Sequence, residues 1–162
     1  MKALILCAGL GTRLQPITDF MPKCMVEING KPVLQHLIEY LNRYEVTDII
    51  VNIHSFPEQV ITKFPNVLFF YEKVPLGEAV TESLLAPWLG NKYLVLNGDT
   101  LTDLPLEKLM GYTHSVKSMD CGVYTGQKLV VKDTEPGEAD FTAWWQDMGT
   151  FSGLAKTINH YS

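Results

Sequence analysis

Short apolar runs alternate along this chain with longer stretches in which apolar residues recur every three or four positions. The short runs are rich in β-branched and aromatic residues, as buried strands are. They predict strands over Ala3–Cys7, Ile49–Ile53, Val67–Tyr71 and Tyr93–Leu96. The helical spacing predicts helices over Glu58–Phe64, Glu78–Trp88, Leu106–His114 and Ser152–His160. Because strands alternate with helices, we expect a mostly parallel sheet with helices on both faces.

One more helix is predicted between the first two strands. It opens at Pro32, a residue suited to the first helical position. Its apolar face consists of Val33, Leu34, Leu37, Ile38 and Leu41, at helical spacing. The expected fold class is therefore α/β, a Rossmann-like three-layer α/β/α sandwich with a mostly parallel, mixed sheet. With 162 residues the chain has the length of one domain, 1–162, and it shows no internal repeat.

Charge and cysteine content narrow the classes of function. The net charge of −5 argues against a non-specific grip on nucleic acid, so any bound anion must be held by local cations. The three cysteines, Cys7, Cys24 and Cys121, lack CxxC spacing and indicate reduced thiols rather than a zinc site. The apolar start is too short for a signal peptide, and no later segment is long enough to cross a membrane. We therefore expect a cytoplasmic protein.

A glycine-rich turn carrying cations follows the first predicted strand. Gly9 and Gly11 let backbone N–H groups approach an anion closely, and Arg13 and Lys23 supply positive charge. The turn is not a P-loop, because the sequence Gly-Lys-Ser/Thr that ends a P-loop is missing. It is not a dinucleotide-binding fingerprint either, because Leu14 stands where that motif has its third glycine. The pattern predicts a phosphate site at the carboxyl end of the first strand. A plain strand-to-helix turn is the alternative.

Three motifs, in order, carry a resemblance to a known family. They are Leu6-Cys7-Ala8-Gly9-Leu10-Gly11-Thr12-Arg13-Leu14 with Pro22-Lys23 and Gly30-Lys31-Pro32, then Val95-Leu96-Asn97-Gly98-Asp99-Thr100, then Trp145-Gln146-Asp147-Met148-Gly149-Thr150. Together they closely resemble the signature of the sugar nucleotidyltransferases, the nucleoside-diphosphate-sugar pyrophosphorylases. The resemblance implies a nucleotidyltransferase-type fold. It also implies Mg²⁺-dependent transfer from an NTP to a sugar 1-phosphate, which yields an NDP-sugar and pyrophosphate.

The resemblance also implies roles for individual residues. Arg13 would grip the β- and γ-phosphates, Lys23 would stabilise charge at the α-phosphate, and Asp99 and Asp147 would hold Mg²⁺. The remaining substrate-binding positions that it implies are Leu6, Ala8, Gly9, Gly11, Thr12 and Asn97. Asp99 directly follows an apolar strand, where a hard oxygen ligand suits Mg²⁺. The alternatives are a turn aspartate at Asp99 and a helix cap at Asp147.

A Pro-Leu-Gly element between the third and fourth strands is implied to approach the nucleobase. Gly77 would lie against the base, and Glu72 would reach its edge. An ionised glutamate only accepts hydrogen bonds, and guanine offers two adjacent donors, which favours GTP. The alternative for Glu72 is a solvated residue after a strand.

The chain departs from the family in the segment that supplies the acceptor site. Only Leu101 to Gln146 stand between the second and third motifs, where relatives carry a longer insertion. This shortening, between about 101 and 146, leaves two alternatives open. One is a nucleotide-binding protein without catalysis. The other is a cytidylyltransferase acting on a small phosphorylated alcohol such as phosphocholine.

Overall fold

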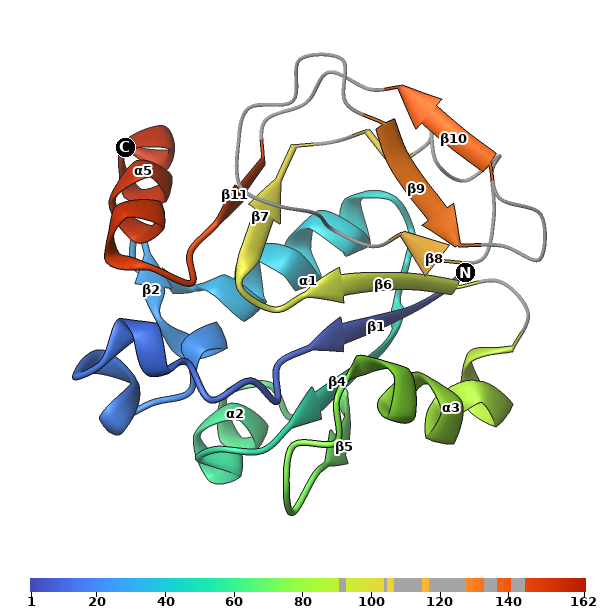
Figure 1. The fold of residues 1–162 in the computed structure, drawn as a ribbon, viewed down its shortest axis with the longest axis horizontal. Coiled ribbons are helices and arrows are strands. Elements are labelled where there is room, and N and C mark those ends of the chain that lie inside the picture. The colour runs from blue at the N-terminus through green and yellow to red at the C-terminus, as the bar shows by residue number, and fades with distance from the viewer. Residues whose placement is uncertain (91–92, 104, 107–114, 117–127, 133–136, 141–144) are drawn as a thin grey trace.

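A parallel sheet forms the centre of the computed structural model, which describes the chain except for residues 91–92, 104, 107–114, 117–127, 133–136 and 141–144 (Figure 1). Its strands are β1 (Lys2–Leu6), β4 (Asp48–Ile53), β5 (Leu68–Tyr71) and β6 (Tyr93–Asn97), in the order β5-β4-β1-β6. Every neighbouring pair in this sheet is parallel. Each predicted strand is confirmed to within one residue at either end.

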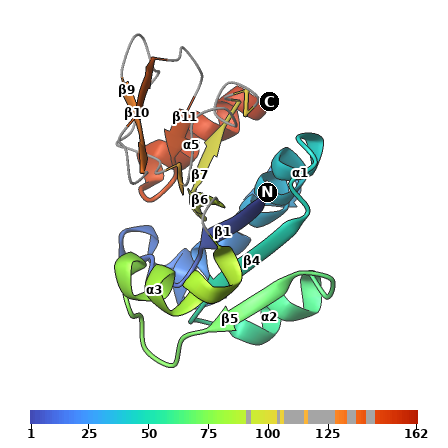
Figure 2. The same ribbon diagram turned by 90° about the vertical axis from the view of Figure 1, so that its right-hand side faces the viewer.

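Helices cover both faces of this sheet, as predicted. Successive strand residues point to opposite faces, so Ala3 and Ile5 of β1 join one apolar cluster while Leu4 joins another. The first cluster includes the apolar side of α1 (Val33–Arg43), and the second includes that of α3 (Glu78–Leu89). Figure 2 shows α1 and α3 on opposite sides of β1. The three-layer α/β/α class is thus confirmed.

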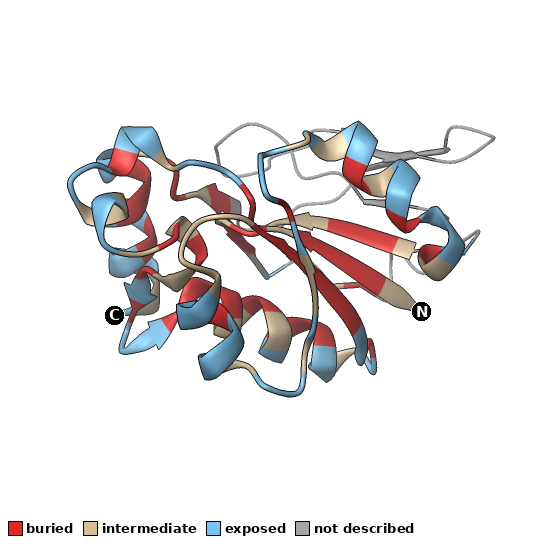
Figure 3. Cartoon of the chain, turned by 90° about the horizontal axis from the view of Figure 1, so that it is seen from below, coloured by how far each residue is buried: buried red, intermediate tan, exposed pale blue. Residues whose placement is uncertain are grey.

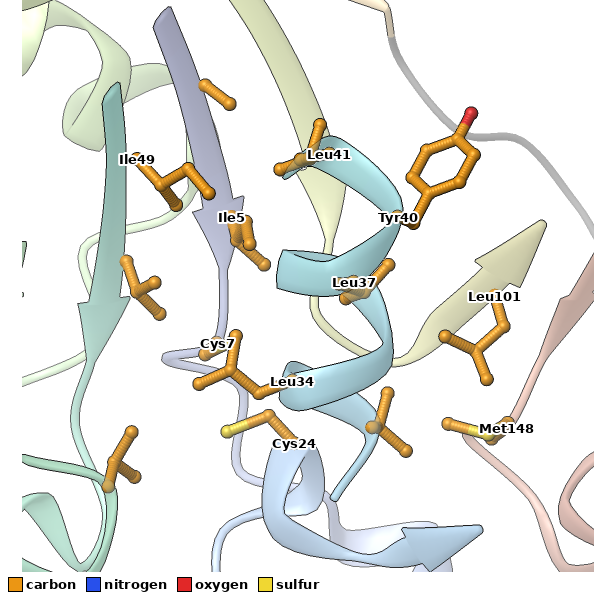
Figure 4. Packing of buried hydrophobic residues seen from close by; sticks show 14 of the residues in the cluster. Ile5, Cys7, Cys24, Leu34, Leu37, Tyr40, Leu41, Ile49, Leu101 and Met148 are labelled. Carbon is orange, nitrogen blue, oxygen red and sulfur yellow. The ribbon is translucent and has the colours of Figure 1, made fainter. Parts of the chain in front are cut away.

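The helix α1 packs with the face that its spacing predicts, with one difference. Val33, Leu34, Leu37 and Leu41 are buried, and Ile38 is half-buried against the same cluster. Tyr40, which is not among the five predicted positions, is buried as well (Figure 4). The apolar stripe is therefore wider than predicted, and the ring of Tyr40 contacts that of Tyr44 edge to face, with 5.5 Å between their centres.

The other helices and the burial pattern agree with the layered arrangement. α2 (Pro57–Lys63) contributes buried Val60, and α5 (Phe151–Tyr161) contributes Leu154. Figure 3 shows the strands of the sheet as largely buried and the outer faces of the helices as exposed. Positions 107–114 of the predicted helix Leu106–His114 lie outside the described residues. No helix in the described part of the chain is both long and apolar enough to cross a bilayer.

Several short elements surround the sheet. The 3-10 helices η1 (Thr12–Leu14), η2 (Ile17–Asp19) and η3 (Lys23–Met25) follow β1 and precede the antiparallel pair β2 (Glu27–Ile28) and β3 (Lys31–Pro32). A second pair joins β7 (Thr100–Thr102) to β11 (Trp145–Asp147). An antiparallel group has the order β10-β9-β8, with β8 at Ser115–Val116, β9 at Lys128–Lys132 and β10 at Gly137–Asp140. None of these elements was predicted.

Candidate active site

A pocket of about 300 Å³ opens at the carboxyl ends of β1 and β6. Its wall includes Leu6, Ala8 and Gly9 from the end of β1 and the turn after it. Asn97 and Asp99 come from the end of β6, Lys23 comes from η3, and Glu72 and Gly77 come from the segment before α3. Eight predicted site residues, far apart in the sequence, therefore line one pocket. Gly11, Thr12, Arg13 and Asp147 are not among its lining residues.

Glycine at position 98 allows the ends of β1 and β6 to come together. The Gly98 N–H donates a 2.8 Å hydrogen bond to the carbonyl of Leu6. A Cβ on Gly98 would lie 2.7 Å from that oxygen and 2.3 Å from Sγ of Cys7, which is closer than real Cβ contacts. Position 98 therefore excludes a side chain. At Gly9, by contrast, an added Cβ meets no atom within 4 Å, so this part of the turn is open to a ligand.

The turn after β1 is held in shape by its second glycine. Gly11 adopts a left-handed backbone with φ of 64°, a conformation that favours glycine. Its carbonyl accepts hydrogen bonds from Leu14 N at 2.9 Å and from Thr18 Oγ1 at 2.8 Å. The first of these bonds begins η1, which carries Thr12 and the exposed Arg13, and the second ties the turn to η2.

Lys23 and Asp99 form an ion pair at the edge of the pocket. The ammonium of Lys23 donates a hydrogen bond to Oδ2 of Asp99, and the two side chains are 16% and 19% exposed. Lys23 is the first residue of η3, and Asp99 follows the last residue of β6 by two positions. The predicted phosphate-binding cation and the predicted metal ligand are thus direct neighbours.

Asp147 joins this pair through the antiparallel strands β7 and β11. In their register Asp147 lies opposite Thr100, the residue after Asp99, and Met148 N donates a 2.9 Å hydrogen bond to the carbonyl of Asp99. The Oδ1 atom of Asp147 accepts a hydrogen bond from Gly149 N. This pairing brings the second predicted metal ligand to the first from 48 positions away, 147 minus 99.

Arg13 and Lys23 meet Asp147 around Gly149. A Cβ built on Gly149 would lie 2.8 Å from Arg13 Nη2, 2.8 Å from Asp147 Oδ1 and 3.0 Å from Lys23 Nζ. Three charged groups therefore converge on the space above one glycine. We call Arg13, Lys23, Asp99 and Asp147 the charged cluster. The sequence singled out all four residues, and the fold places them together.

The donor set of the charged cluster fits a hard divalent cation. Two carboxylates stand beside a space that phosphate oxygens can share, and Mg²⁺ is commonly held by one or two carboxylates together with substrate phosphates. Within the described residues, no group of three or more His, Cys, Asp or Glu side chains could hold a metal ion by itself. Water molecules or phosphate oxygens would complete the coordination of such an ion.

The carboxylate of Glu72 is buried, whereas one alternative from the sequence was a solvated residue after a strand. Its side chain is 2% exposed, and its oxygens accept hydrogen bonds from Asn52 Nδ2, Thr81 Oγ1 and the backbone N–H of Leu76. These bonds tie the segment after β5 to β4 and α3. The predicted contact between Glu72 and the edge of a base would require its carboxylate to leave these partners.

Asn52 is a site residue that the sequence reasoning missed. It is 4% exposed within the apolar strand β4, and its Oδ1 accepts a 2.6 Å hydrogen bond from Cys7 N. Its Nδ2 donates to Glu72 Oε1 at 2.9 Å. A chain of hydrogen bonds thus links the glycine-rich turn to the Pro-Leu-Gly segment. The available signal was a lone amide in an otherwise apolar run, since a buried amide needs hydrogen-bond partners.

Cys7, directly after β1, and Cys24, in η3, are free and buried thiols (Figure 4). Burial raises the pKa of the Cys7 thiol well above its ordinary value, and a hydrogen bond with Cys24 raises this pKa further. The Cys7 thiol therefore stays protonated near neutral pH. Cys7 is also part of the main apolar cluster.

A family model described as Nucleotidyl transferase matches residues 2–135. The chain belongs to this family. A probable mannose-1-phosphate guanylyltransferase 2 of Arabidopsis thaliana is 33% identical over 153 residues, covering 85% of this chain and 40% of the relative. A D-glycero-alpha-D-manno-heptose 1-phosphate guanylyltransferase of Campylobacter jejuni is 39% identical over 118 residues, covering 67% of this chain and 52% of the relative. The motif resemblance to sugar nucleotidyltransferases is thereby confirmed.

A solved structure supports the fold of this nucleotidyl transferase family member. The crystal structure of HddC from Yersinia pseudotuberculosis superposes with a TM-score of 0.74 at 21% sequence identity, and the match covers 99% of both chains. The two curated relatives are longer, so this chain spans only about two fifths to one half of their length.

Proposed function

We propose that this chain transfers a nucleotidyl group from an NTP to a sugar 1-phosphate, forming an NDP-sugar and pyrophosphate. The observation that carries the proposal is the charged cluster of two cations and two carboxylates, of which Lys23 and Asp99 line a pocket on the carboxyl side of a parallel sheet. Open α/β sheets bind their ligands at this edge. The names of both curated relatives, a mannose-1-phosphate and a heptose 1-phosphate guanylyltransferase, support the class of donor and acceptor.

The reaction makes modest demands on the protein because its nucleophile is already ionised. A phosphate monoester has a second pKa of about 6, so its oxygen attacks the α-phosphorus without a general base. The protein must align the substrates and neutralise charge on the phosphoryl oxygens. This explains why a site without a catalytic histidine or cysteine suffices.

Each member of the charged cluster has a proposed task. Arg13 holds the β- and γ-phosphates, and Lys23 leaves Asp99 to stabilise charge on the α-phosphate. Asp99 and Asp147 hold Mg²⁺, which when bound acts as a Lewis acid on the phosphoryl oxygens. The backbone from Leu6 to Thr12 follows the phosphates, because the open face of Gly9 leaves room for them.

We further propose guanine as the base, since both curated relatives described above are guanylyltransferases. Gly77, at the edge of the pocket, and Asn97, in its wall, border the space for the nucleoside. The reaction belongs to the cytoplasm in this proposal, where nucleoside triphosphates are supplied and thiols such as Cys7 and Cys24 remain reduced.

Pyrophosphate release tests the proposal directly. The chain is incubated with Mg²⁺, one of GTP, UTP, CTP, ATP and dTTP, and a panel of sugar 1-phosphates, with phosphocholine as a further acceptor. Release that requires a sugar 1-phosphate supports the proposal. Release only from CTP with phosphocholine would favour the cytidylyltransferase. Nucleotide binding without release from any pair would favour a binding protein without catalysis.

A further inference from the structure

Asn52 is a buried amide in a strand whose other buried residues are aliphatic. The strand β4 lies between β1 and β5, and isoleucine or valine occupies its remaining buried positions. Burying an amide is unfavourable unless its hydrogen-bonding groups find partners. An aliphatic side chain would serve the packing of this strand better, so the role of the amide lies in its hydrogen bonds.

The amide of Asn52 joins two parts of the pocket wall. Its Oδ1 accepts a 2.6 Å hydrogen bond from the backbone N–H of Cys7, and its Nδ2 donates a 2.9 Å hydrogen bond to Oε1 of Glu72. All three residues line the pocket. Cys7 is directly followed by Ala8 and Gly9, which lead into the glycine-rich turn. One side chain therefore sets the distance between this turn and the segment after β5.

Glu72 gives the amide of Asn52 a fixed point of attachment. Its carboxylate also accepts from Thr81 Oγ1 in α3 and from Leu76 N at 2.9 Å. Its own N–H donates to the carbonyl of Ile53 at 2.8 Å. Because the side chain is only 2% exposed, water does not readily replace a broken bond. The glycine-rich turn is thus tied to β4 and α3 through Asn52.

The contact has a direction, because the two ends of an amide differ. An ionised carboxylate only accepts hydrogen bonds, so Nδ2 must face Glu72 and Oδ1 must face Cys7. The same link can be rebuilt with the two groups exchanged. A carboxylate at position 52 would accept from Cys7 on one oxygen and from an amide at position 72 on the other. That amide would still accept from Leu76 on its oxygen.

We propose that Asn52 is a positioning residue for nucleotidyl transfer, because it holds the glycine-rich turn at the place where the turn meets the phosphates of the nucleotide. This inference rests on the proposed function, since the position of the turn matters only when a nucleotide binds there. Gly9 has open space on the side of its missing Cβ, so packing on that side does not fix the turn. A displacement of about 1 Å in a positioned group can lower a rate by on the order of 100-fold.

Exchange of the amide and the carboxylate tests this inference. Asn52→Asp, Glu72→Gln and the double variant are compared with the wild type in pyrophosphate release, with the NTP and sugar 1-phosphate that react fastest. Rates are measured per folded molecule, well below the melting temperature of every variant. Asn52→Asp should lower kcat by about tenfold or more and change the KM for the nucleotide by less than about threefold, because the charged cluster still binds the phosphates. The double variant should recover most of the loss.

Asn42→Asp is the matched control. It makes the same chemical change at an exposed position of α1 that does not line the pocket, and it should keep the wild-type kcat. Asn52→Ser removes the bridge without adding a charge, because its hydroxyl is too short to reach both partners. This variant should also lose activity, and it carries the test if Asn52→Asp does not fold. A merely structural role would lower the melting temperature without changing kcat per folded molecule.

A folded Asn52→Asp or Asn52→Ser variant with the wild-type kcat would overturn the inference. A double variant that stays as slow as Asn52→Asp would do the same. Both results require an active wild-type chain, so they leave the proposed function standing. A wild-type chain that releases no pyrophosphate from any pair of substrates would overturn the proposed function, and the inference with it.

Discussion

The ammonium of Lys23 contacts the carboxylate of Asp99 although 76 positions separate these residues. One side of the contact comes from a short 3-10 helix, and the other comes from the end of a central strand. Both side chains are mostly shielded from water, so each neutralises the other in the free protein. A nucleotide with its cation would replace this internal pairing by a pairing of the cation with Asp99 and of the phosphate with Lys23.

Lys23→Ala and Asp99→Asn should each lower turnover by on the order of 100-fold or more. Removing one charge-stabilising group from a phosphoryl or acyl transition state has an effect of this size. Steady-state pyrophosphate release measures the loss, and thermal melting checks that each variant is folded. Lys31→Ala is a suitable control, because Lys31 forms an exposed ion pair with Glu39 at 2.9 Å. A folded Lys23→Ala variant with full activity would contradict the role of Lys23.

Gly149→Ala should impair activity while leaving the fold intact. The new methyl group would lie 2.8 Å from Arg13 Nη2 and 3.0 Å from Lys23 Nζ, so it displaces both cations. These atoms are the ends of flexible side chains and can move at little cost to stability. A displacement of about 1 Å in a positioned group can cost on the order of 100-fold in rate.

The measurement for Gly149→Ala is the rate of pyrophosphate release at saturating substrate, with the melting temperature as a check. Ser152→Ala, at an exposed position in the same segment, is the control and should match the wild type. Unchanged turnover in Gly149→Ala would show that the charged cluster need not converge on this glycine.

Glu72→Gln should lower the free energy of unfolding by about 1–3 kcal/mol, the cost of leaving a buried polar group badly paired. The amide cannot accept on both of its ends, so one of the donors on Asn52, Thr81 and Leu76 loses its partner. Urea denaturation measures the change. Glu39→Gln on the exposed surface of α1 should cost less than about 1 kcal/mol. Equal stability of Glu72→Gln and the wild type would show that the hydrogen bonds of Glu72 do not stabilise the fold.

Tyr93 should titrate with a pKa of about 12, because burial disfavours the phenolate. The neighbouring Glu82 disfavours it further, since its carboxylate accepts a 2.9 Å hydrogen bond from the Tyr93 hydroxyl. The unfolded pKa of Tyr93 is about 10. The contribution of Tyr93 to stability is therefore complete below a pH of about 10 and is lost as the pH rises through about 12, because between these values the proton leaves the unfolded state but not the folded one. Tyrosinate absorbance during an alkaline titration checks this. The difference between wild type and Tyr93→Phe should show the late transition, and a difference centred near pH 10 would contradict it.

The four central strands and the helices α1, α2, α3 and α5 were predictable because their signal is local. A buried strand needs a short apolar run, and an amphipathic helix needs apolar residues every three or four positions, so each pattern lies within one segment. The burial of Tyr40 was not predicted, because the aromatic ring of a tyrosine favours burial whereas its hydroxyl favours exposure. The extent of the domain, 1–162, stays a prediction.

The short strands β7 and β11 could not be predicted from their own residues. Strands of three residues are too short to show a periodic pattern. Each exists because the other supplies its hydrogen-bond partners, and the central pair, Gln146 and Leu101, is 45 positions apart, 146 minus 101. The same holds for Asn52 and Glu72, whose roles depend on donors and acceptors that only the packed sheet brings within reach. The contact of Glu72 with the edge of a base, which the resemblance implies, stays a prediction.

The sequence by itself determined the family, the layered fold and the identity of Arg13, Lys23, Asp99 and Asp147 as candidates, because motifs and periodicity are properties of consecutive residues. Only the tertiary structure decided that these four side chains share one space and that Lys23 rests on Asp99. It also decided that the carboxylate of Glu72 is buried among three hydrogen-bond donors. The physical reason is that charge pairing and hydrogen bonding depend on distances between segments, and the packing of strands and helices sets those distances.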